Sequence, residues 1–490
     1  MLRLKARFLR RGGFQARPLV GVAVEGRFET RPYVSARLLV ALLACSGACG
    51  DDGDASDTES AGRGPGGGED GGLPDARAAG LDGGPAVDAG RPDAGDSGGG
   101  QDPPPIVGSD YVDFGALQPT ARGVVQLELD VPDDARSFVL TADPGTVPRD
   151  LALLDLRGPS GDLLYDATAD PPQPFDPATA QNGSEQLPYA WMLPSSPELA
   201  LEPGRYRIAL YVGPPPSDGT AASARDGGVD AGGRDRSAVR GGPVRVDAVL
   251  ARGRDREPPR ALSLVFWALQ GAALDAQAAA ADPQLSQALA VMAELFAAAG
   301  IAVAPASFRE LADPSAPELA LLEGDGELAR LLALLAEQAG PERALDILLV
   351  DELAAEPGKT VLAKVSGVPV PPPHPALARR GAVVLPLASL PAEAARAGAL
   401  LAHELSHALG LRHTSEFDGL RHDPIADTPA CPVERASQLG SAGQPLLSAE
   451  DCADLDGSNL LFYTAPQSAL SQGALTPGQA HVLSRSPLLR

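Results

Sequence analysis

Three histidines, one glutamate and one glycine stand at fixed spacings in the C-terminal part of the sequence, as His403-Glu404-x-x-His407-x-x-Gly410-x-x-His413. On a helix, His403 and His407 project from the same face one turn apart, so both rings can bind one metal ion. Gly410 can leave right-handed helical geometry, which lets the chain turn and bring back His413 as a third nitrogen ligand. The spacing therefore predicts a zinc site with Glu404 beside it and a fourth position left for water.

The first five residues of this motif have a simpler explanation, a surface helix with two solvated histidines. The glycine and the third histidine favour the metal site, because both fall where the ligand geometry requires them. A structural zinc site would need a fourth protein ligand, usually cysteine, and no cysteine has a suitable spacing. Three neutral imidazoles leave the ion its full charge, which lowers the pKa of bound water to about 7. Glu404 is then the expected base, which takes the proton as water attacks a peptide carbon.

The eleven-residue motif resembles the signature of the metzincin zinc metallopeptidases. Downstream, the segment Asp-Pro-Ile-Ala-Asp-Thr-Pro at 423–429 and the nearby cysteines are similar to the pappalysin or cytophagalysin branch of that clan. The resemblance covers roughly residues 257–466 and implies a zinc-dependent endopeptidase acting on protein or peptide substrates. An alternative from another class is a surface lipoprotein that keeps the metal fold as a binding module, with weak or lost catalysis.

The same resemblance assigns residues outside the motif. Leu461 occupies the methionine position of the Met-turn, a bend beneath the zinc ligands, and leucine is close to methionine in volume. Tyr463 matches a tyrosine that some metzincins use as an extra metal ligand or as a donor to the developing oxyanion, although a packed core tyrosine would look the same. The family binds calcium near Asp-Thr-Pro segments, which implies a calcium site at Asp423, Asp427 and Thr428, with a solvated acidic loop as the alternative.

Cys431 and Cys452 are the only cysteines in the region expected to fold. In an exported protein, a disulfide between them would close a loop of about 20 residues and contribute on the order of 3 kcal/mol. Two free buried thiols are the alternative if the protein is not exported. The remaining histidines, His374, His422 and His481, are expected at surface positions, with His422 as an alternative metal ligand.

The first 45 residues are interpreted as an export signal whose true start is Val34. Leu42-Leu43-Ala44-Cys45 resembles a bacterial lipobox, which predicts lipidation of Cys45; ordinary cleavage near Ala48 with free secretion is the alternative, and Cys49 is the other cysteine available for modification. A cell-envelope lipoprotein or a secreted protein is therefore expected. No apolar stretch approaches the ~18 residues that span a bilayer, so membrane contact is expected only through a lipid anchor.

Composition bounds the domain organisation. A chain of 490 residues with 44% hydrophobic residues can form two folded domains plus linkers. Residues 46–105 are rich in Gly, Asp and Pro with almost no large apolar residues, which predicts a flexible acidic linker. The formal net charge of −24 argues against a nucleic-acid partner, because phosphate binding needs a basic surface.

Residues 106–255 contain short apolar runs separated by turn signals. This rhythm predicts an accessory domain built as a β-sandwich or jelly roll, with a flexible loop at 214–243. The expected strands are 124–131, 137–142, 151–156 and 206–212.

Residues 256–490 alternate between strand and helix patterns. Strands are expected at 262–269, 301–304, 346–350 and 381–385. Helices are expected at 327–339 and from Pro283, with Asp282 as the N-cap, to a closing Gly300. Pro391 is expected to open the histidine-bearing helix, whose buried stripe of Leu401, Leu405 and Leu409 would turn the metal-binding face toward a cleft. The expected fold class is α+β: a β-sandwich or jelly roll followed by a metzincin-like catalytic domain of a twisted sheet plus the active-site helix.

Overall fold

A computed structural model gives the fold of the chain. It describes residues 109–145, 147, 149–167, 187–213, 242–253, 260–313, 315–340, 342–354, 361–373, 379–387, 390–440, 443–464 and 472–490. The predicted export signal with Cys45 and Cys49, the predicted acidic linker, almost all of loop 214–243 and His374 lie outside these residues.

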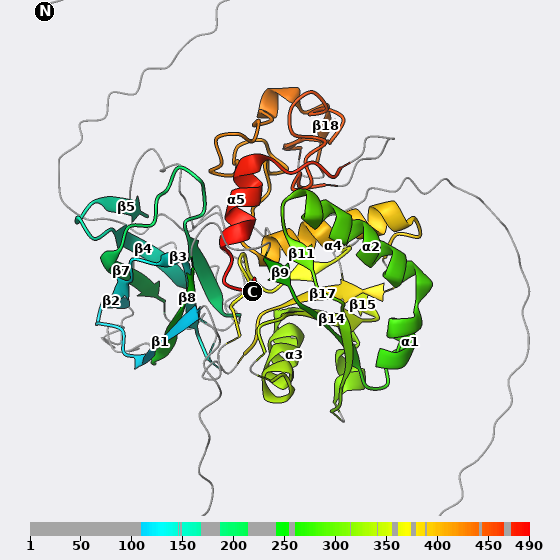
Figure 1. The fold of residues 1–490 in the computed structure, drawn as a ribbon, viewed down its shortest axis with the longest axis horizontal. Helices are drawn as coiled ribbons and strands as arrows, with labels where there is room; N and C mark the ends of the chain where they lie inside the picture. Colours follow the sequence, from blue (N-terminus) through cyan, green and yellow to red (C-terminus); the bar gives the residue numbers. More distant parts are fainter. Residues whose placement is uncertain are drawn as a thin grey trace, which may run out of the picture. The chain divides into compact units, whose positions relative to one another are not determined.

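Two four-stranded antiparallel sheets form the first part of the described chain (Figure 1). One has the strand order β1-β8-β3-β6, and the other has the order β2-β7-β4-β5. The strands are β1 (Ser109–Leu117), β2 (Val124–Val131), β3 (Ala135–Asp143), β4 (Leu151–Arg157), β5 (Leu163–Asp166), β6 (Tyr189–Leu193), β7 (Gly204–Val212) and β8 (Val244–Arg252).

The two sheets pack face to face as a β-sandwich. Strand β2 alternates buried and exposed residues, as a strand with one face in the core must. Its Leu127 and Leu129 share one apolar cluster with Ile208 of β7 and with Phe138 and Leu140 of β3 in the opposite sheet. Each of the four strands expected from the apolar runs is present, and three of them extend one or two residues further at one or both ends.

A five-stranded sheet forms the centre of the second part, in the order β12-β10-β14-β17-β16. Its first four strands are parallel, and the edge strand β16 runs antiparallel to β17. The strands are β10 (Leu264–Leu269), β12 (Ser307–Leu311), β14 (Leu345–Val350), β16 (Lys364–Val365) and β17 (Ala382–Pro386). Short two-stranded pairings are formed by β9 (Ala261–Leu262) with β11 (Ala302–Val303), β13 (Leu321–Leu322) with β15 (Glu352–Leu353), and β18 (Gln438–Leu439) with β19 (Pro445–Leu446).

Helices cover both faces of this sheet (Figure 1). Alternate strand residues point to opposite faces, so Phe266 and Ile347 join the cluster packed against α2 and α4, whereas Trp267 and Leu348 join the cluster packed against α3. The helices are α1 (Ala276–Ala281), α2 (Pro283–Ala298), α3 (Asp325–Gln338), α4 (Ala394–Ala408) and α5 (Pro477–Arg485), with 3-10 turns η3 (Ala316–Leu319) and η5 (Val433–Arg435). The molecule is thus of the α+β class. Within the described ranges, no helix is long and apolar enough to cross a membrane.

Local signals placed α2 correctly and α4 only approximately. The side chain of Asp282 accepts a hydrogen bond from Leu285 N at 2.7 Å and Pro283 is the first residue of α2, as the sequence predicts. Pro391 does not open the histidine-bearing helix, because α4 begins at Ala394. The backbone carbonyl of Pro391 instead accepts a hydrogen bond from the Gln284 side chain at 2.7 Å, which ties the approach to α4 to the first turn of α2.

Helix α4 lies very close to α2 at Gly398. A Cβ atom at this position would stand 2.5 Å from Val291 Cβ and 2.8 Å from the Ala288 carbonyl oxygen. Only a residue without a side chain allows this approach, so Gly398 sets the distance between the histidine-bearing helix and its neighbour.

Candidate metal centre

The motif of three histidines folds as a helix end followed by a reversal. His403 and His407 lie one turn apart in α4, and Gly410 follows the helix with a φ of 113°, in the region that favours glycine. A Cβ atom at Gly410 would also stand 2.5 Å from the Met192 Cε atom of β6. The chain can therefore turn back at this position and return His413 to the helix.

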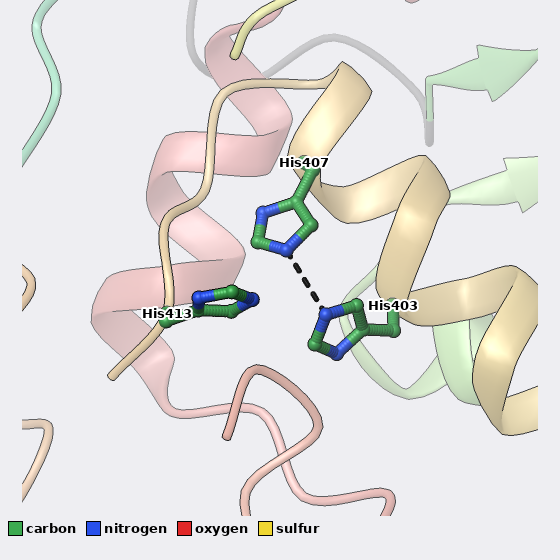
Figure 2. A group of neighbouring side chains, drawn as sticks. All are labelled: His403, His407 and His413. Atoms are coloured by element: carbon green, nitrogen blue, oxygen red, sulfur yellow. Dashed lines mark hydrogen bonds between the residues drawn. The ribbon is translucent and has the colours of Figure 1, made fainter. Parts of the chain in front are cut away.

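The three imidazole rings face one another (Figure 2). The centroid of the His407 ring is 4.6 Å from those of both His403 and His413, and the latter two are 5.3 Å apart. His403 and His407 are buried, His413 is nearly so, and their candidate ligand atoms all lie within 4.8 Å of one another. The structure thus brings together all three residues that the sequence motif proposes as ligands.

Each ring is oriented by an oxygen atom at its Nδ1. His403 Nδ1 is 2.7 Å from the Leu460 carbonyl oxygen, His407 Nδ1 is 2.8 Å from that of Leu411, and His413 Nδ1 is 3.3 Å from the Glu416 carboxylate. A carbonyl or carboxylate oxygen can only accept, so in each pair the Nδ1–H must donate. We infer that Nδ1 carries the proton of each neutral ring, which leaves Nε2 with a bare lone pair.

The bare nitrogens converge on one another. His403 Nε2 and His407 Nε2 are 3.0 Å apart, which is the contact dashed in Figure 2, and His413 Nε2 is buried with no hydrogen-bond partner. Burial, reinforced by the neighbouring imidazoles, lowers the pKa of His403 to about 3 and that of His407 well below its usual value, so neither ring holds a second proton. Three desolvated lone pairs pointed at one another are costly unless they share a cation.

This donor set fits a zinc ion. Zinc accepts neutral imidazole nitrogen at about 2.0–2.1 Å, which in tetrahedral geometry separates the ligand nitrogens by about 3.3 Å. Hydrogen bonding of the opposite ring nitrogen to an oxygen is the usual way in which a protein fixes the tautomer of a zinc-bound histidine. Among the residues that the structure describes, no further His, Cys, Asp or Glu completes the group, so a fourth coordination position would remain for water or substrate.

Glu404 lies next to these ligands in α4. It is buried, and burial raises the pKa of its carboxyl group to about 7, against the opposing attraction of His413. A carboxyl group with a pKa near neutrality can both accept and release a proton at physiological pH, as a general base must.

The backbone bend at 456–462 lies beneath the histidines. The Leu460 carbonyl oxygen accepts a hydrogen bond from His403 Nδ1. The Leu461 carbonyl oxygen accepts one at 2.9 Å from the backbone nitrogen of Thr414, the residue that follows His413. The Leu461 side chain is fully buried in the same core cluster as Leu405 of α4. The residue that was assigned to the Met-turn position therefore occupies an apolar environment below the ligand helix.

Tyr463 stands close to the site but its hydroxyl group has another partner. Its ring centroid is 6.5 Å from that of His413, and the hydroxyl donates to the Leu447 carbonyl oxygen. The hydroxyl is thus directed to the backbone in this structure, and its predicted role at the metal or the oxyanion stays a prediction.

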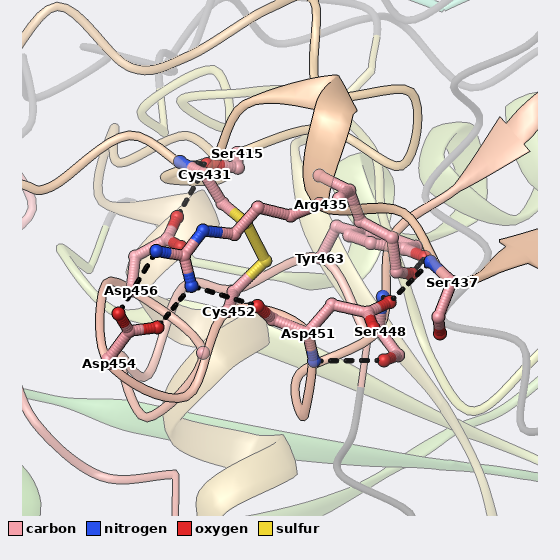
Figure 3. Close-up of a disulfide and its surroundings, with 12 residues drawn as sticks. Ser415, Cys431, Arg435, Ser437, Ser448, Asp451, Cys452, Asp454, Asp456 and Tyr463 are labelled. Atoms are coloured by element: carbon pink, nitrogen blue, oxygen red, sulfur yellow. Dashed lines mark hydrogen bonds and ion pairs between the residues drawn. A yellow bond between two sulfur atoms is a disulfide. The ribbon is translucent and has the colours of Figure 1, made fainter. Parts of the chain in front are cut away.

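A disulfide joins Cys431 to Cys452, as the sequence predicts (Figure 3). The bridge is buried with Leu447 and Phe462, and Cys431 N donates to the Ser415 hydroxyl at 2.9 Å. It therefore anchors the segment that follows His413 to the segment that precedes the bend at 456–462.

The three residues of the predicted calcium site do not have the same environment. Thr428 donates to Asp423 Oδ1, which also accepts from Ile425 N at 3.2 Å, while Asp423 Oδ2 is buried without a hydrogen-bond partner. The two oxygens of Asp427 instead accept from Thr476 Oγ1 at 2.7 Å and from Gly478 N at 2.8 Å. Asp423 and Thr428 thus lie together, whereas Asp427 binds the N-terminus of α5.

The other described histidines lie apart from the triad. His422 Nδ1 is 3.1 Å from the Ser415 hydroxyl, and His481 is part of α5. Helix α5 itself was not anticipated. Its signal is present in the sequence as Thr476-Pro477-Gly478-Gln479, a capping box with proline at the first helical position.

Comparison with known proteins leaves the family open. No family model and no curated protein matches the chain. Among solved structures, a chain named metalloproteinase-II from Bacteroides fragilis matches with a TM-score of 0.21 and 18% identity, over 38% of this chain and 60% of that chain, so the match spans less than two thirds of that protein. A match this slight carries no argument, and the assignment of function rests on the geometry above.

The geometry predicts which histidine variants lose zinc. His413→Ala removes one of the three ligands. Loss of a residue that only orients a ligand lowers metal affinity by up to about 100-fold, so we expect loss of a ligand itself to lower zinc affinity by more than this. His422→Ala is the matched control, since His422 lies on the same segment but bonds to Ser415. Metal content after dialysis against a weak chelator distinguishes them, and equal zinc in both variants would show that the triad is not the site.

Proposed function

We propose that this protein is a zinc-dependent endopeptidase of the metzincin type. The observation that carries the proposal is the convergence of three Nε2 atoms whose opposite Nδ1 atoms are each held by an oxygen. A catalytic rather than structural role is supported by the lack of a fourth ligand among the described residues and by a buried glutamate next to the ligands. The pappalysin branch is a finer proposal, supported by the sequence of segment 423–429.

Each group of the site has a role in peptide hydrolysis. Bound zinc would supply Lewis acidity, polarising the scissile carbonyl and acidifying water. Glu404 takes the proton from the attacking water and then delivers it to the leaving amine nitrogen, a sequence that its pKa of about 7 allows. The Leu460 and Leu411 carbonyls and the Glu416 carboxylate hold the three imidazoles in one tautomer throughout.

The alternative is a metal-binding surface protein with weak or lost catalysis. An intact Glu404 argues for the enzyme, because a protein selected only to hold the metal has no use for a buried carboxyl group beside it. The leucine at position 461 departs from the Met-turn pattern, yet its buried apolar surroundings accept leucine and methionine alike.

We also propose that the protein is exported, either anchored in a bacterial cell envelope through lipid on Cys45 or freely secreted. The disulfide supports export, since such bridges persist in oxidising compartments. Labelling of cells with a fatty acid distinguishes the two destinations. Label that survives in a Cys45→Ser variant would exclude lipidation at this cysteine.

Substitution of Glu404 separates catalysis from metal binding. Glu404→Gln keeps the shape of the side chain but removes the base, so we expect casein hydrolysis to fall by about 10²–10⁴-fold while zinc content stays at the wild-type level. Glu434→Gln, on the exposed turn η5, serves as the control and should retain full activity. Unchanged hydrolysis by the Glu404 variant would rule out the proposed mechanism.

Tyr463 provides a test of oxyanion stabilisation. To stabilise the oxyanion, the Tyr463 hydroxyl would leave the Leu447 carbonyl oxygen and donate its hydrogen bond to the substrate oxygen. Tyr463→Phe should then lower kcat by about 10²-fold with little change in KM. Steady-state kinetics on a fluorogenic peptide measures both constants. A variant with normal kcat and a lowered Tm would instead assign the hydroxyl a purely structural role.

We further propose that calcium binds at Asp423 and Thr428. Burial raises the pKa of Asp423 to about 7, and a cation beside its unpartnered Oδ2 would compensate for the buried charge. Added Ca²⁺ should therefore raise the Tm of the wild type but not that of Asp423→Asn. Asp454→Asn, at an exposed side chain paired with Arg435, is the control and should respond like the wild type. An equal response of all three proteins would place calcium elsewhere.

A further inference from the structure

The orientation of His403 depends on a single peptide group in the bend at 456–462. The oxygen of the Leu460–Leu461 peptide accepts the bond from His403 Nδ1 at 2.7 Å. The N–H of the same peptide donates to the side-chain Oδ1 of Asn459 at 2.8 Å. Because a peptide group is planar, fixing its nitrogen end also fixes where its oxygen points. Asn459 therefore holds the acceptor that orients the His403 ring.

Asn459 is itself held by helix α5. Its Nδ2 donates to Gln479 Oε1 at 2.9 Å, and Gln479 Nε2 donates back to Asn459 Oδ1 at 3.2 Å. This reciprocal contact is called the amide pair below. Both side chains are buried, with 5% and 0% of their surface exposed, so neither can replace its partner with bulk water.

Gln479 has a fixed position because it is part of the helix cap. Its Oε1 accepts from Thr476 N at 3.0 Å, and its own N–H donates to Thr476 Oγ1 at 3.1 Å. Asp427 binds the same turn through Gly478 N and Thr476 Oγ1. The glutamine is thus constrained at its backbone and at both ends of its amide group.

We propose that Gln479 is a positioning residue for the metal ligand His403, acting through Asn459 and the Leu460–Leu461 peptide. The path runs from the cap of α5 through the amide pair to that peptide and then to the imidazole, and each step is a hydrogen bond between described atoms. Its effect is to hold His403 Nε2 toward the other two ligands before a metal ion arrives. This inference rests on the zinc site of the proposed function and on no step of catalysis.

Two substitutions at Gln479 interrupt the path to different degrees. Gln479→Glu keeps the oxygen that accepts from Thr476 N and Asn459 Nδ2, but it cannot donate to Asn459 Oδ1. The helix cap is preserved, so we expect this variant to fold even if a more disruptive substitution does not. Gln479→Leu removes both bonds of the pair and leaves Asn459 Nδ2 unsatisfied. Val482→Ala is the matched control, because this buried residue of α5 contributes to packing without belonging to the amide pair.

The experiment measures zinc affinity of the full chain by competition with a chromophoric chelator, together with the visible absorption spectrum of the cobalt-substituted protein. We expect both Gln479 variants to bind zinc about tenfold more weakly and to show a shifted cobalt spectrum, whereas Val482→Ala keeps wild-type values despite a lower Tm. Wild-type affinity in the Gln479 variants, or an equal loss in Val482→Ala, would overturn the proposal. Neither measurement uses a substrate, so failure of this inference and absence of proteolysis are separate results.

Discussion

Three desolvated imidazole nitrogens pointed at one another are the constraint on which the rest of this structure depends. Nothing local favours such an arrangement, because rings that carry their proton on Nδ1, as inferred above, offer only lone pairs at their neighbouring Nε2 atoms. It persists because the opposite edge of each ring is bonded to an oxygen that belongs to a different part of the fold: the bend at 456–462, the turn after α4, and Glu416. The surroundings thus fix the direction of each ring, and a bound divalent cation would make the arrangement favourable.

The larger elements explain how those oxygens are brought to the ligands. The central sheet and α2 support α4 on its apolar stripe, and the close approach at Gly398 leaves α4 little freedom to move relative to α2. On the other side of the ligands, the disulfide and the amide pair hold the bend beneath His403. The β-sandwich also contributes, since Val139 of β3 and Met192 of β6 belong to the same core cluster as α4 and Met192 contacts Gly410. The candidate metal centre is therefore supported by segments that lie far apart in the described chain.

The sequence predicts those parts of the site that depend on local geometry. The ligand spacing follows from one helical turn and one glycine, and strands such as β2 and β7 are predicted by apolar runs between turn signals. Strand β3 is buried along nearly its whole length, because one face packs in the sandwich while Val139 on the other face belongs to the core cluster of α2 and α4. Strand β8 is buried to a similar extent and was not anticipated. Asn459 and Gln479 could not be paired, because 20 residues separate them and a buried amide has no signature in composition. Helix α5 could have been predicted from the sequence, since its capping box is a local pattern.

In the bend at 456–462, the backbone and the side chain of Leu461 make different contributions to the site. The carbonyl oxygens of Leu460 and Leu461 accept hydrogen bonds from His403 and from Thr414 N, respectively. A side-chain substitution at either position leaves these carbonyl groups in place. The side chain has only to fill apolar space, and it belongs to the same core cluster as Leu405 and Leu409. Leucine and methionine are close in volume, and exchanges of this kind cost less than about 1.5 kcal/mol in well-packed cores. A leucine in place of methionine at this position is therefore compatible with an intact ligand geometry. Asn459 constrains the bend more than the side chain at 461 does, because its Oδ1 accepts a hydrogen bond from Leu461 N.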